Sequence, residues 1–250
     1  MRAIKSIVLR AGLYSQARYI DRHLLRRREL HRMVEMSRFF EAFVPRGALC
    51  FDIGANIGEV SEALLSGPRA RVVAVEPQPE CLVELRERCR AFTTLTTLGA
   101  VVSAHPGVET LYMRTHEGQA SLDPNWEGTE AGTLDVPAIT LALIVARYGH
   151  PHYLKIDVEG AEAAVLSTLD RPLPWISFEY HRQAHEQART CLRILEQLGG
   201  DQEVNLTVAE QVIFQFDQWI PLKEFIARLE EVLPRDGYGD MYVRTQLDGR

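Results

Sequence analysis

The stretch "CFDIGANIGEV", at positions 50–60, is the first part of this sequence whose residue types suit ligand binding. Gly54 and Gly58 leave room for a ligand close to the backbone, and the helix expected after them presents free N–H groups and a partial positive charge. The loop is not the dinucleotide fingerprint, because Asn56 stands where that pattern requires its second glycine. A pyrophosphate is therefore disfavoured, whereas an amino-acid-like carboxylate fits, with Asn56 near its polar end.

Glu76 ends the apolar run "VVAVE", 22 residues after Gly54. An acid at the end of the second strand can accept hydrogen bonds from both hydroxyls of a ribose. NAD and S-adenosylmethionine both contain a ribose, so Glu76 alone does not separate them, and only the loop sequence favours the cofactor without a pyrophosphate. The sequence holds no GxxxxGK[ST] pattern, which excludes a P-loop nucleotide-binding protein.

Two further segments place charged residues where strands of a parallel sheet are expected to end. In "KIDVEGAE", Lys155, Asp157 and Glu159 alternate and so share one face of a strand. In "FEYH", Glu179 and His181 share a face of the next strand. Open α/β sheets bind ligands at the carboxyl ends of their strands. We therefore expect Asp157, Glu179 and His181 to converge there if the two strands are neighbours.

Three interpretations of this cluster stay open: a general base with its orienting acid, a divalent metal site, and a structural hydrogen-bonded network. A histidine ordinarily titrates near neutral pH, which makes His181 the best candidate base, with Asp157 or Glu179 to orient it. Glu162 is expected to cap the following helix instead, since acids favour a first helical turn. For Glu159, both a place in the cluster and a role as helix cap are expected equally.

The elements that must hold these residues alternate between short apolar runs and amphipathic segments. This rhythm is typical of βαβ units and a parallel sheet. Strands are expected in "ALCFDIG", "ARVVAVEP", "TTLGAVV", "YLKIDVEG", "WISFEYH", "EVNLTV", "QVIFQF" and "DMYVRT", and helices at 59–66, 79–92, 141–148, from 161, at 186–198 and at 222–233.

Residues 103–138 interrupt the rhythm with two expected strands, "ETLYMR" and "TLDVPAI", around a polar loop that contains Ser121 and Trp126. An insertion of this length is often a lid or binding loop, so we expect it to shape the pocket of the second substrate. The expected organisation is an N-terminal helical segment, 1–45, followed by one α/β domain, 46–250, that carries the lid-like insertion.

The N-terminal segment is basic, with 11 Lys and Arg against 4 Asp and Glu in residues 1–46, whereas the whole chain has a formal net charge of -6. That overall charge argues against nucleic acid as a partner of the whole molecule. The N-terminal helices are expected to pack against the main domain or against a second subunit, which would make a homodimer. A basic surface for an anionic membrane or an acidic substrate is the alternative.

The cysteines and the apolar runs bear on the compartment. The four cysteines form no metal-binding spacing, and no run approaches the roughly 18 apolar residues of a membrane span. The apolar stretch near the N-terminus is interrupted by Arg10, which leaves it too short for a signal-peptide core. A reducing, cytoplasmic setting without export is expected.

Taken together, "FDIGANIG", "VVAVEPQP", "LKIDVEGAE", "FEYH" and the late "YGDMYVR" resemble the FkbM family of S-adenosylmethionine-dependent methyltransferases. The likeness spans roughly Phe51 to Arg244 and leaves the first 45 residues without a motif. It implies the Rossmann-like α/β fold of class I methyltransferases, with a seven-stranded, mostly parallel sheet, helices on both faces and one antiparallel strand near the C-terminus. It also implies methyl transfer to oxygen, commonly on sugars or polyketide-like natural products, with S-adenosylhomocysteine as product.

The resemblance further implies which residues contact the cofactor. The glycine loop would line its methionine part, Glu76 would hold the ribose, and the residues after the third strand would lie by the adenine. The residues so assigned are Asp52, Gly54, Ala55, Asn56, Gly58, Glu76, Pro77, Gly99, Ala100 and Val101. The acceptor does not carry over, because members of the family differ in substrate.

Two hypotheses compete with an O-methyltransferase. One is an NAD(P)-dependent oxidoreductase, and the other is a non-catalytic assembly protein that uses its basic N-terminal helices. Within the methyltransferase hypothesis, a variant in which Asp157, Glu179 and His181 hold Mg²⁺ stays open. It ranks below the metal-free version because the sequence contains no complete ligand set.

Overall fold

The computed structural model describes residues 30–114, 120–126, 130–209, 211–234 and 237–246. The predicted helices in residues 1–29 therefore lie outside the described residues. Residues 30–41 form a helix, as predicted, and the expected turn follows it at 46–47. No helix within the described residues is long and apolar enough to cross a membrane.

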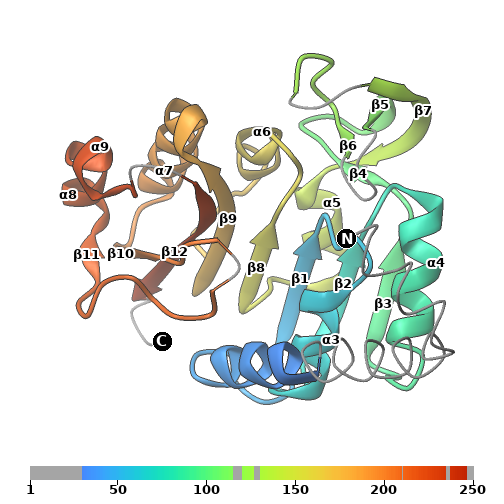
Figure 1. Ribbon diagram of the computed structural model, residues 1–250, viewed down its shortest axis with the longest axis horizontal. Helices are drawn as coiled ribbons and strands as arrows, with labels where there is room; N and C mark the ends of the chain where they lie inside the picture. Colours follow the sequence, from blue (N-terminus) through green and yellow to red (C-terminus); the bar gives the residue numbers. More distant parts are fainter. Residues whose placement is uncertain (1–29, 115–119, 127–129, 210, 235–236, 247–250) are drawn as a thin grey trace, which may run out of the picture.

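Eight strands among the described residues form the main sheet, which runs through the middle of the molecule from β11 at one edge to β3 at the other (Figure 1). Their order is β11-β10-β12-β9-β8-β1-β2-β3. The strands are β1 (Leu49–Ile53), β2 (Arg71–Val75), β3 (Leu95–Leu98), β8 (Tyr153–Ile156), β9 (Trp175–His181), β10 (Asp201–Leu206), β11 (Ile220–Pro221) and β12 (Tyr238–Gln246).

The directions of the strands match the class I arrangement. β3, β2, β1, β8 and β9 are parallel neighbours, whereas β12 runs antiparallel to both β9 and β10. β12 is the reversed strand near the C-terminus that the resemblance implied, but it is not the only one among the described strands, because β11 runs in the same direction. The two-residue β11, antiparallel to β10, is an eighth strand beyond the seven expected.

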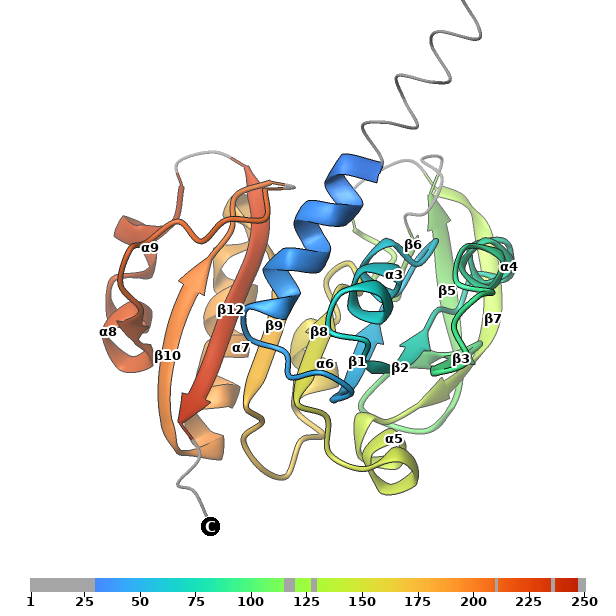
Figure 2. The same cartoon turned by 90° about the horizontal axis from the view of Figure 1, so that it is seen from below.

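Helices cover both faces of the main sheet because its side chains alternate between two buried sides. Cys50 joins the cluster under helix 30–41, α3 (Glu59–Ser66) and α4 (Pro79–Arg88). Phe51 and Ile53 point the other way into the larger cluster. That cluster is covered by α5 (Leu141–Tyr148), α6 (Glu162–Leu166), α7 (His185–Leu198), α8 (Leu222–Ala227) and α9 (Leu229–Val232). Figure 2 shows helix 30–41 and α3 lying across the first face.

The insertion forms a second, smaller sheet in the order β4-β7-β5-β6. Its strands are β4 (Val101–Val102), β5 (Gly107–Arg114), β6 (Ala120–Ser121) and β7 (Glu130–Ile139). The single strand predicted in "TTLGAVV" is wrong, because the chain leaves the main sheet after Leu98 and Val101 pairs with Ala138 of the insertion. Residues 99–100 thus connect the two sheets.

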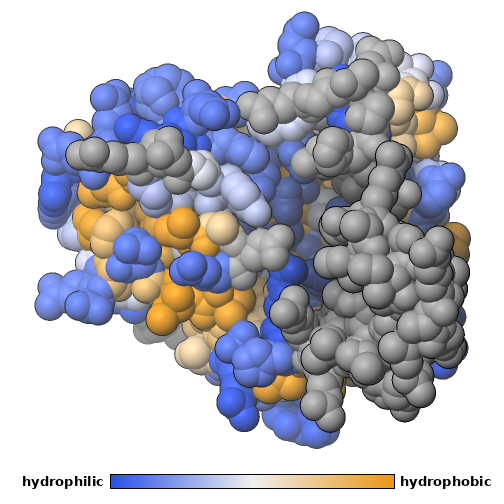
Figure 3. All heavy atoms as spheres, viewed as in Figure 1, coloured by the Kyte–Doolittle hydropathy of each residue, from blue (hydrophilic) through white to orange (hydrophobic). Residues whose placement is uncertain are grey.

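The strand predicted in "QVIFQF" is also wrong, because residues 211–216 form no strand. The side chain of Asn205 holds this segment by bonding both the N–H and the carbonyl of Phe216. Phe214 packs against Phe39 and Tyr242. Side-chain contacts of this kind replace the strand-to-strand backbone hydrogen bonds that the apolar pattern of residues 211–216 had indicated. Apolar residues gather on the surface over β11 and this segment (Figure 3).

Candidate active site

The glycine loop between β1 and α3 folds as expected, with three residues in left-handed backbone conformations. Gly54, Asn56 and Gly58 have φ values of 79°, 48° and 86°. A Cβ atom at Gly54 would overlap the carbonyl oxygen of Asp157, and one at Gly58 would meet Leu85 of α4 at 2.9 Å. Close packing of the protein's own elements therefore requires both glycines. That they also give clearance to a cofactor stays a prediction.

Glu76 lies at the end of β2 and is almost fully buried. Its two carboxylate oxygens accept hydrogen bonds from the backbone N–H of Asn56 at 2.8 Å and of Gln78 at 2.9 Å. Burial raises the pKa of Glu76, while these two donors oppose the rise. Because a carboxylate has about four lone-pair sites, it can still accept hydrogen bonds from two ribose hydroxyls.

Two cavities meet at the carboxyl edge of the sheet. The narrow one, of about 80 Å³, lies beside Glu76 and is lined by apolar side chains and by four further polar residues, Asn56, Gln78, Asp157 and Glu159. The larger one, of about 440 Å³, opens between the glycine loop, helix 30–41 and the start of β12. They share Gly54, Asn56 and Asp157. The two cavities therefore adjoin each other at the glycine loop.

The residues assigned to cofactor binding divide into two groups. Those that line a cavity are Gly54, Ala55, Asn56, Glu76, Pro77, Ala100 and Val101. Asp52, Gly58 and Gly99 line neither. Asp52 is fully buried below the loop, and the hydroxyl of Ser61 donates to its Oδ2 at 2.6 Å. We therefore reassign Asp52 from ligand contact to holding the loop against α3.

The narrow cavity fits an adenosine in its chemistry, because a buried carboxylate lies beside apolar walls. Part of that wall was missed in the sequence. Leu111, Ala120 and Leu122 of the insertion line it together with Val102. No described insertion residue lines the larger cavity. The expectation that the insertion shapes the pocket of the second substrate stays a prediction.

Lys155 lies in β8 and is buried beneath the larger cavity. It donates to Asp157 Oδ2 at 2.8 Å. Burial alone would lower the pKa of Lys155, but the carboxylates of Asp157, Asp52 and Asp240 outweigh burial and raise it. Asp240, on the antiparallel β12, has a pKa raised to about 6 by burial. The positive charge of Lys155 thus offsets the negative charges of acids on or next to three strands, and its hydrogen bond holds the carboxylate of Asp157.

The predicted convergence at the ends of β8 and β9 is present, with one change of membership. His181 Nε2 and Glu179 Oε2 lie 3.1 Å apart. Burial raises the pKa of Glu179 to about 7, while the hydrogen bond with His181 opposes the rise. Glu159 joins this group, because ligand atoms of Glu159, Glu179 and His181 all lie within 4.8 Å of one another, while Asp157 lines the larger cavity together with Glu179.

The neighbours of this group explain its shape. Glu159 has a left-handed φ of 51°, and its carboxylate accepts a hydrogen bond from Trp126 Nε1 at 2.9 Å. The Trp126 ring also meets the His181 ring edge to face, at 5.7 Å between centroids. Glu162 accepts from the N–H groups of Val158 and Gly160, which agrees with its predicted capping role.

The helix at 30–41 carries none of the motifs, yet it supplies part of the site. Arg32, Met36 and Phe40 line the larger cavity, and Met36 and Phe40 are buried against the sheet. Packing of this helix on its own domain agrees with the first of the two expectations for the N-terminal segment.

The fold and the family model together define a class I S-adenosylmethionine-dependent methyltransferase. The chain belongs to the FkbM family, because the family model described as "Methyltransferase FkbM domain" matches residues 52–222. This assignment decides against the NAD(P)-dependent oxidoreductase and the non-catalytic assembly protein. No curated protein sequence matches the chain.

Several solved structures are similar at low sequence identity. A precorrin-6y C5,15-methyltransferase from Geobacter metallireducens GS-15 is 15% identical, with a TM-score of 0.45, over 86% of this chain and 87% of that one. A TehB-like SAM-dependent methyltransferase from Corynebacterium glutamicum ATCC 13032 Kitasato is 10% identical, with a TM-score of 0.46, over 92% and 100%. The fibrillarin of Aeropyrum pernix with natively bound S-adenosyl-L-methionine is 13% identical, with a TM-score of 0.43, over 80% and 68%. None of these similarities bears on the acceptor.

Proposed function

We propose that the protein transfers the methyl group of S-adenosylmethionine to a hydroxyl oxygen of a sugar, a glycan or a similarly hydroxylated natural product. The observation that carries this proposal is the hydrogen-bonded pair of His181 and Glu179 beside the larger cavity, which Glu179 lines. The cofactor supplies a methyl group that is already activated on a sulfonium. The protein therefore has to align the acceptor and remove the proton of its hydroxyl.

His181 is the proposed general base. Its Nε2 lies 3.1 Å from Glu179 Oε2, and this contact holds the ring beside the carboxylate that lines the larger cavity. The carboxylate of Glu179 then stabilises the imidazolium that forms. Trp126 and Tyr238 flank the ring, with centroids 5.7 Å and 6.0 Å from it, and restrict both its rotation and its contact with water.

The lining of the larger cavity supports a hydroxylated acceptor. Asp157, Glu179 and Asp240 present carboxylates to it. Carboxylates accept hydrogen bonds from neighbouring hydroxyls, and charged acceptors make stronger bonds than neutral ones. Tyr238, which is 40% exposed, adds an aromatic ring at the edge. A polyol satisfies such a lining better than an apolar acceptor does.

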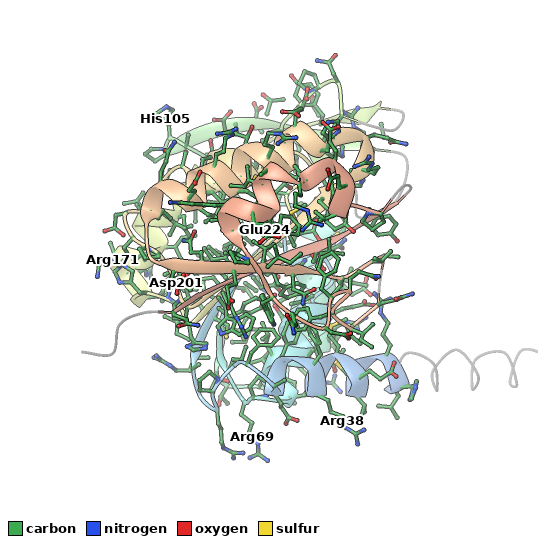
Figure 4. The ribbon with its side chains drawn as sticks, turned by 90° about the vertical axis from the view of Figure 1, so that its left-hand side faces the viewer. Arg38, Arg69, His105, Arg171, Asp201 and Glu224 are labelled. Atoms are coloured by element: carbon green, nitrogen blue, oxygen red, sulfur yellow. The ribbon has the colours of Figure 1, made fainter. Side chains whose placement is uncertain are left out.

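A screen for methyl transfer from labelled S-adenosylmethionine tests the proposal, with panels of glycans, hydroxylated small molecules and amines. We expect transfer to a hydroxyl, and a fall in kcat of about 10²- to 10⁴-fold in His181→Ala, as for loss of a general base. His105→Ala is the matched control, because His105 is an exposed residue on the outer surface of the insertion (Figure 4). Transfer to amines alone, or full turnover in His181→Ala, would overturn the assignment.

A metal-assisted version has one observation in its favour, the grouping of Glu159, Glu179 and His181. A divalent cation there would lower the pKa of the acceptor hydroxyl and make the base less important. Assays after treatment with EDTA, with and without added Mg²⁺ or Mn²⁺, decide between the versions. Activity that survives EDTA unchanged excludes the metal.

The homodimer and the cytoplasmic location stay predictions. A chain cut before residue 45 does not test the dimer cleanly, because it would remove Met36 and Phe40 from the core. Gel filtration of the full chain beside a chain that begins at residue 30 is the better comparison. A dimer through the N-terminal helices predicts a larger species for the full chain only.

A further inference from the structure

Helix 30–41 lies outside the part of the chain that the family model matches, residues 52–222. It nevertheless crosses the sheet face that carries Lys155 (Figure 2), and Arg32 near its start lies beside Glu59, which follows the glycine loop. Met36 and Phe40 fix the helix to the sheet, and this places Arg32, one turn earlier, at the larger cavity. The position of Arg32 is therefore determined by buried contacts of its own helix.

The cofactor has two chemically different parts, a nucleoside and an amino-acid tail with an ammonium and a carboxylate. Glu76 and the apolar walls of the narrow cavity suit the nucleoside. The larger cavity adjoins it through Gly54, Asn56 and Asp157. A nucleoside on Glu76 would thus direct its tail along the glycine loop into the larger cavity, where the carboxylate needs a cation.

Arg32 and Lys155 are the cationic side chains that line the larger cavity among the described residues. Lys155 is committed to the buried acids around it and donates to Asp157 at 2.8 Å. Arg32 is different, because its side chain is 40% exposed and its Nη1 lies 3.6 Å from Glu59 Oε2. That distance is beyond the usual range of an N–H···O hydrogen bond, and an exposed ion pair contributes only about 0–1 kcal/mol. The guanidinium of Arg32 therefore lies at the wall of the larger cavity beside Glu59, outside the buried group of acids around Lys155.

The start of α3, beside Arg32, is a position that favours a negative charge, and Glu59 occupies it. It is the first residue of α3, whose N-terminus carries a partial positive charge. A ligand carboxylate near the same helix end and Arg32 would benefit from both, in the fork geometry that guanidinium offers to carboxylates.

We propose that Arg32 binds the carboxylate of the amino-acid tail of S-adenosylmethionine and S-adenosylhomocysteine. Helix 30–41 is then part of the cofactor site, although it precedes the family domain. The inference concerns the cofactor alone and does not depend on the acceptor or on the role of His181.

Calorimetric titration tests this without turnover, with two ligands that differ in the tail. S-adenosylhomocysteine carries the amino-acid tail, and methylthioadenosine has the same nucleoside and sulfur without it. In Arg32→Ala, we expect the Kd of S-adenosylhomocysteine to rise at least about 10-fold, as for loss of a charged hydrogen bond. The Kd of methylthioadenosine should stay within about twofold of the wild-type value. Arg32→Lys keeps the charge but loses the forked guanidinium. Its Kd for S-adenosylhomocysteine should lie between those of the wild type and Arg32→Ala.

Arg38→Ala is the matched control, because Arg38 lies on the same helix and projects away from the protein (Figure 4). It should change neither Kd. Unchanged binding of methylthioadenosine also shows that the variant is folded. Equal weakening of both ligands by Arg32→Ala would mean a structural role and overturn the proposal. Unchanged binding of S-adenosylhomocysteine would overturn it as well, including the case in which only the KM of an acceptor rises.

Discussion

Removing the charge of Lys155 should destabilise the protein strongly, and more so at neutral pH than in acid. Lys155 Nζ lies 2.8 Å from Asp157 Oδ2 and is buried with Asp52 and Asp240 nearby. At an effective dielectric constant of about 20, a pair at this distance attracts by about 6 kcal/mol before desolvation is counted. In Lys155→Met the desolvated acids remain, so we expect the free energy of unfolding at pH 7.5 to fall by about 3–5 kcal/mol.

The pH dependence follows from the acids that Lys155 leaves behind. Burial already raises the pKa of Asp240 to about 6 and also raises that of Asp52, with Lys155 opposing both. Without Lys155 both values rise further above those of the unfolded chain. An acid whose pKa is raised by folding costs nothing when protonated and destabilises the fold as pH rises through its unfolded and folded values. The deficit of Lys155→Met should therefore shrink by about 1–2 kcal/mol between pH 7.5 and pH 5.

Urea unfolding followed by circular dichroism at both pH values measures this deficit. Lys223→Met is the matched control, because Lys223 is exposed on α8 and should cost less than about 0.5 kcal/mol. The double variant Lys155→Met, Asp240→Asn removes one of the buried carboxylates that Lys155→Met leaves without a cation. It should recover part of the lost free energy of unfolding. A deficit below about 1 kcal/mol at pH 7.5, or one that grows toward pH 5, would refute the reasoning.

Three further predictions follow from the site. Gly54→Ala should lower the free energy of unfolding by more than about 2 kcal/mol, because its Cβ would overlap the carbonyl of Asp157. Gly47→Ala has nearly the same positive φ, 77° against 79°, but open space around it, and should cost only about 1 kcal/mol in urea unfolding; equal losses would contradict the packing argument. Glu76→Gln should weaken binding of both S-adenosylhomocysteine and adenosine by about 10-fold or more in calorimetry, because ribose hydroxyls lose a charged acceptor; a loss for only one of the two would contradict the ribose assignment. The kcat/KM should rise with pH until about 7, where Glu179 ionises and can stabilise the imidazolium of His181; a flat profile between about pH 6 and pH 8 would speak against this pairing.

The elements that the sequence predicted best are those with a strong local signal. The helices at 59–66 and 141–148 were predicted with the bounds that the structure has, since an apolar period and a turn or cap residue mark each end. Thr140 caps the second of them by accepting from the N–H of Leu143. Glu76 was likewise identified from its place at the end of an apolar run, and its hydrogen bonds to the glycine loop agree with a site residue.

The wrong predictions share a cause: contacts with residues far away in the chain determined the local structure. Residues 211–216 have an apolar pattern, but the side chain of Asn205 hydrogen-bonds to their backbone, and Phe214 packs against Phe39. Val101 pairs with Ala138 of the insertion instead of extending β3. In the group of Glu159, Glu179 and His181, Glu159 has a left-handed φ and its carboxylate lies near His181, whereas Asp157 accepts a hydrogen bond from Lys155.

The sequence by itself determined the α/β class, the glycine loop, the ribose acid and the family, because each of these is written in short segments with their own spacing. Only the tertiary structure decided why Gly54 has no side chain, which acid joins His181, and that helix 30–41 lines the larger cavity. These depend on the register of β1, β8, β9 and β12, and on the packing of Met36 and Phe40 against them. Contacts of this kind join residues up to about 200 positions apart, and no local pattern can encode them.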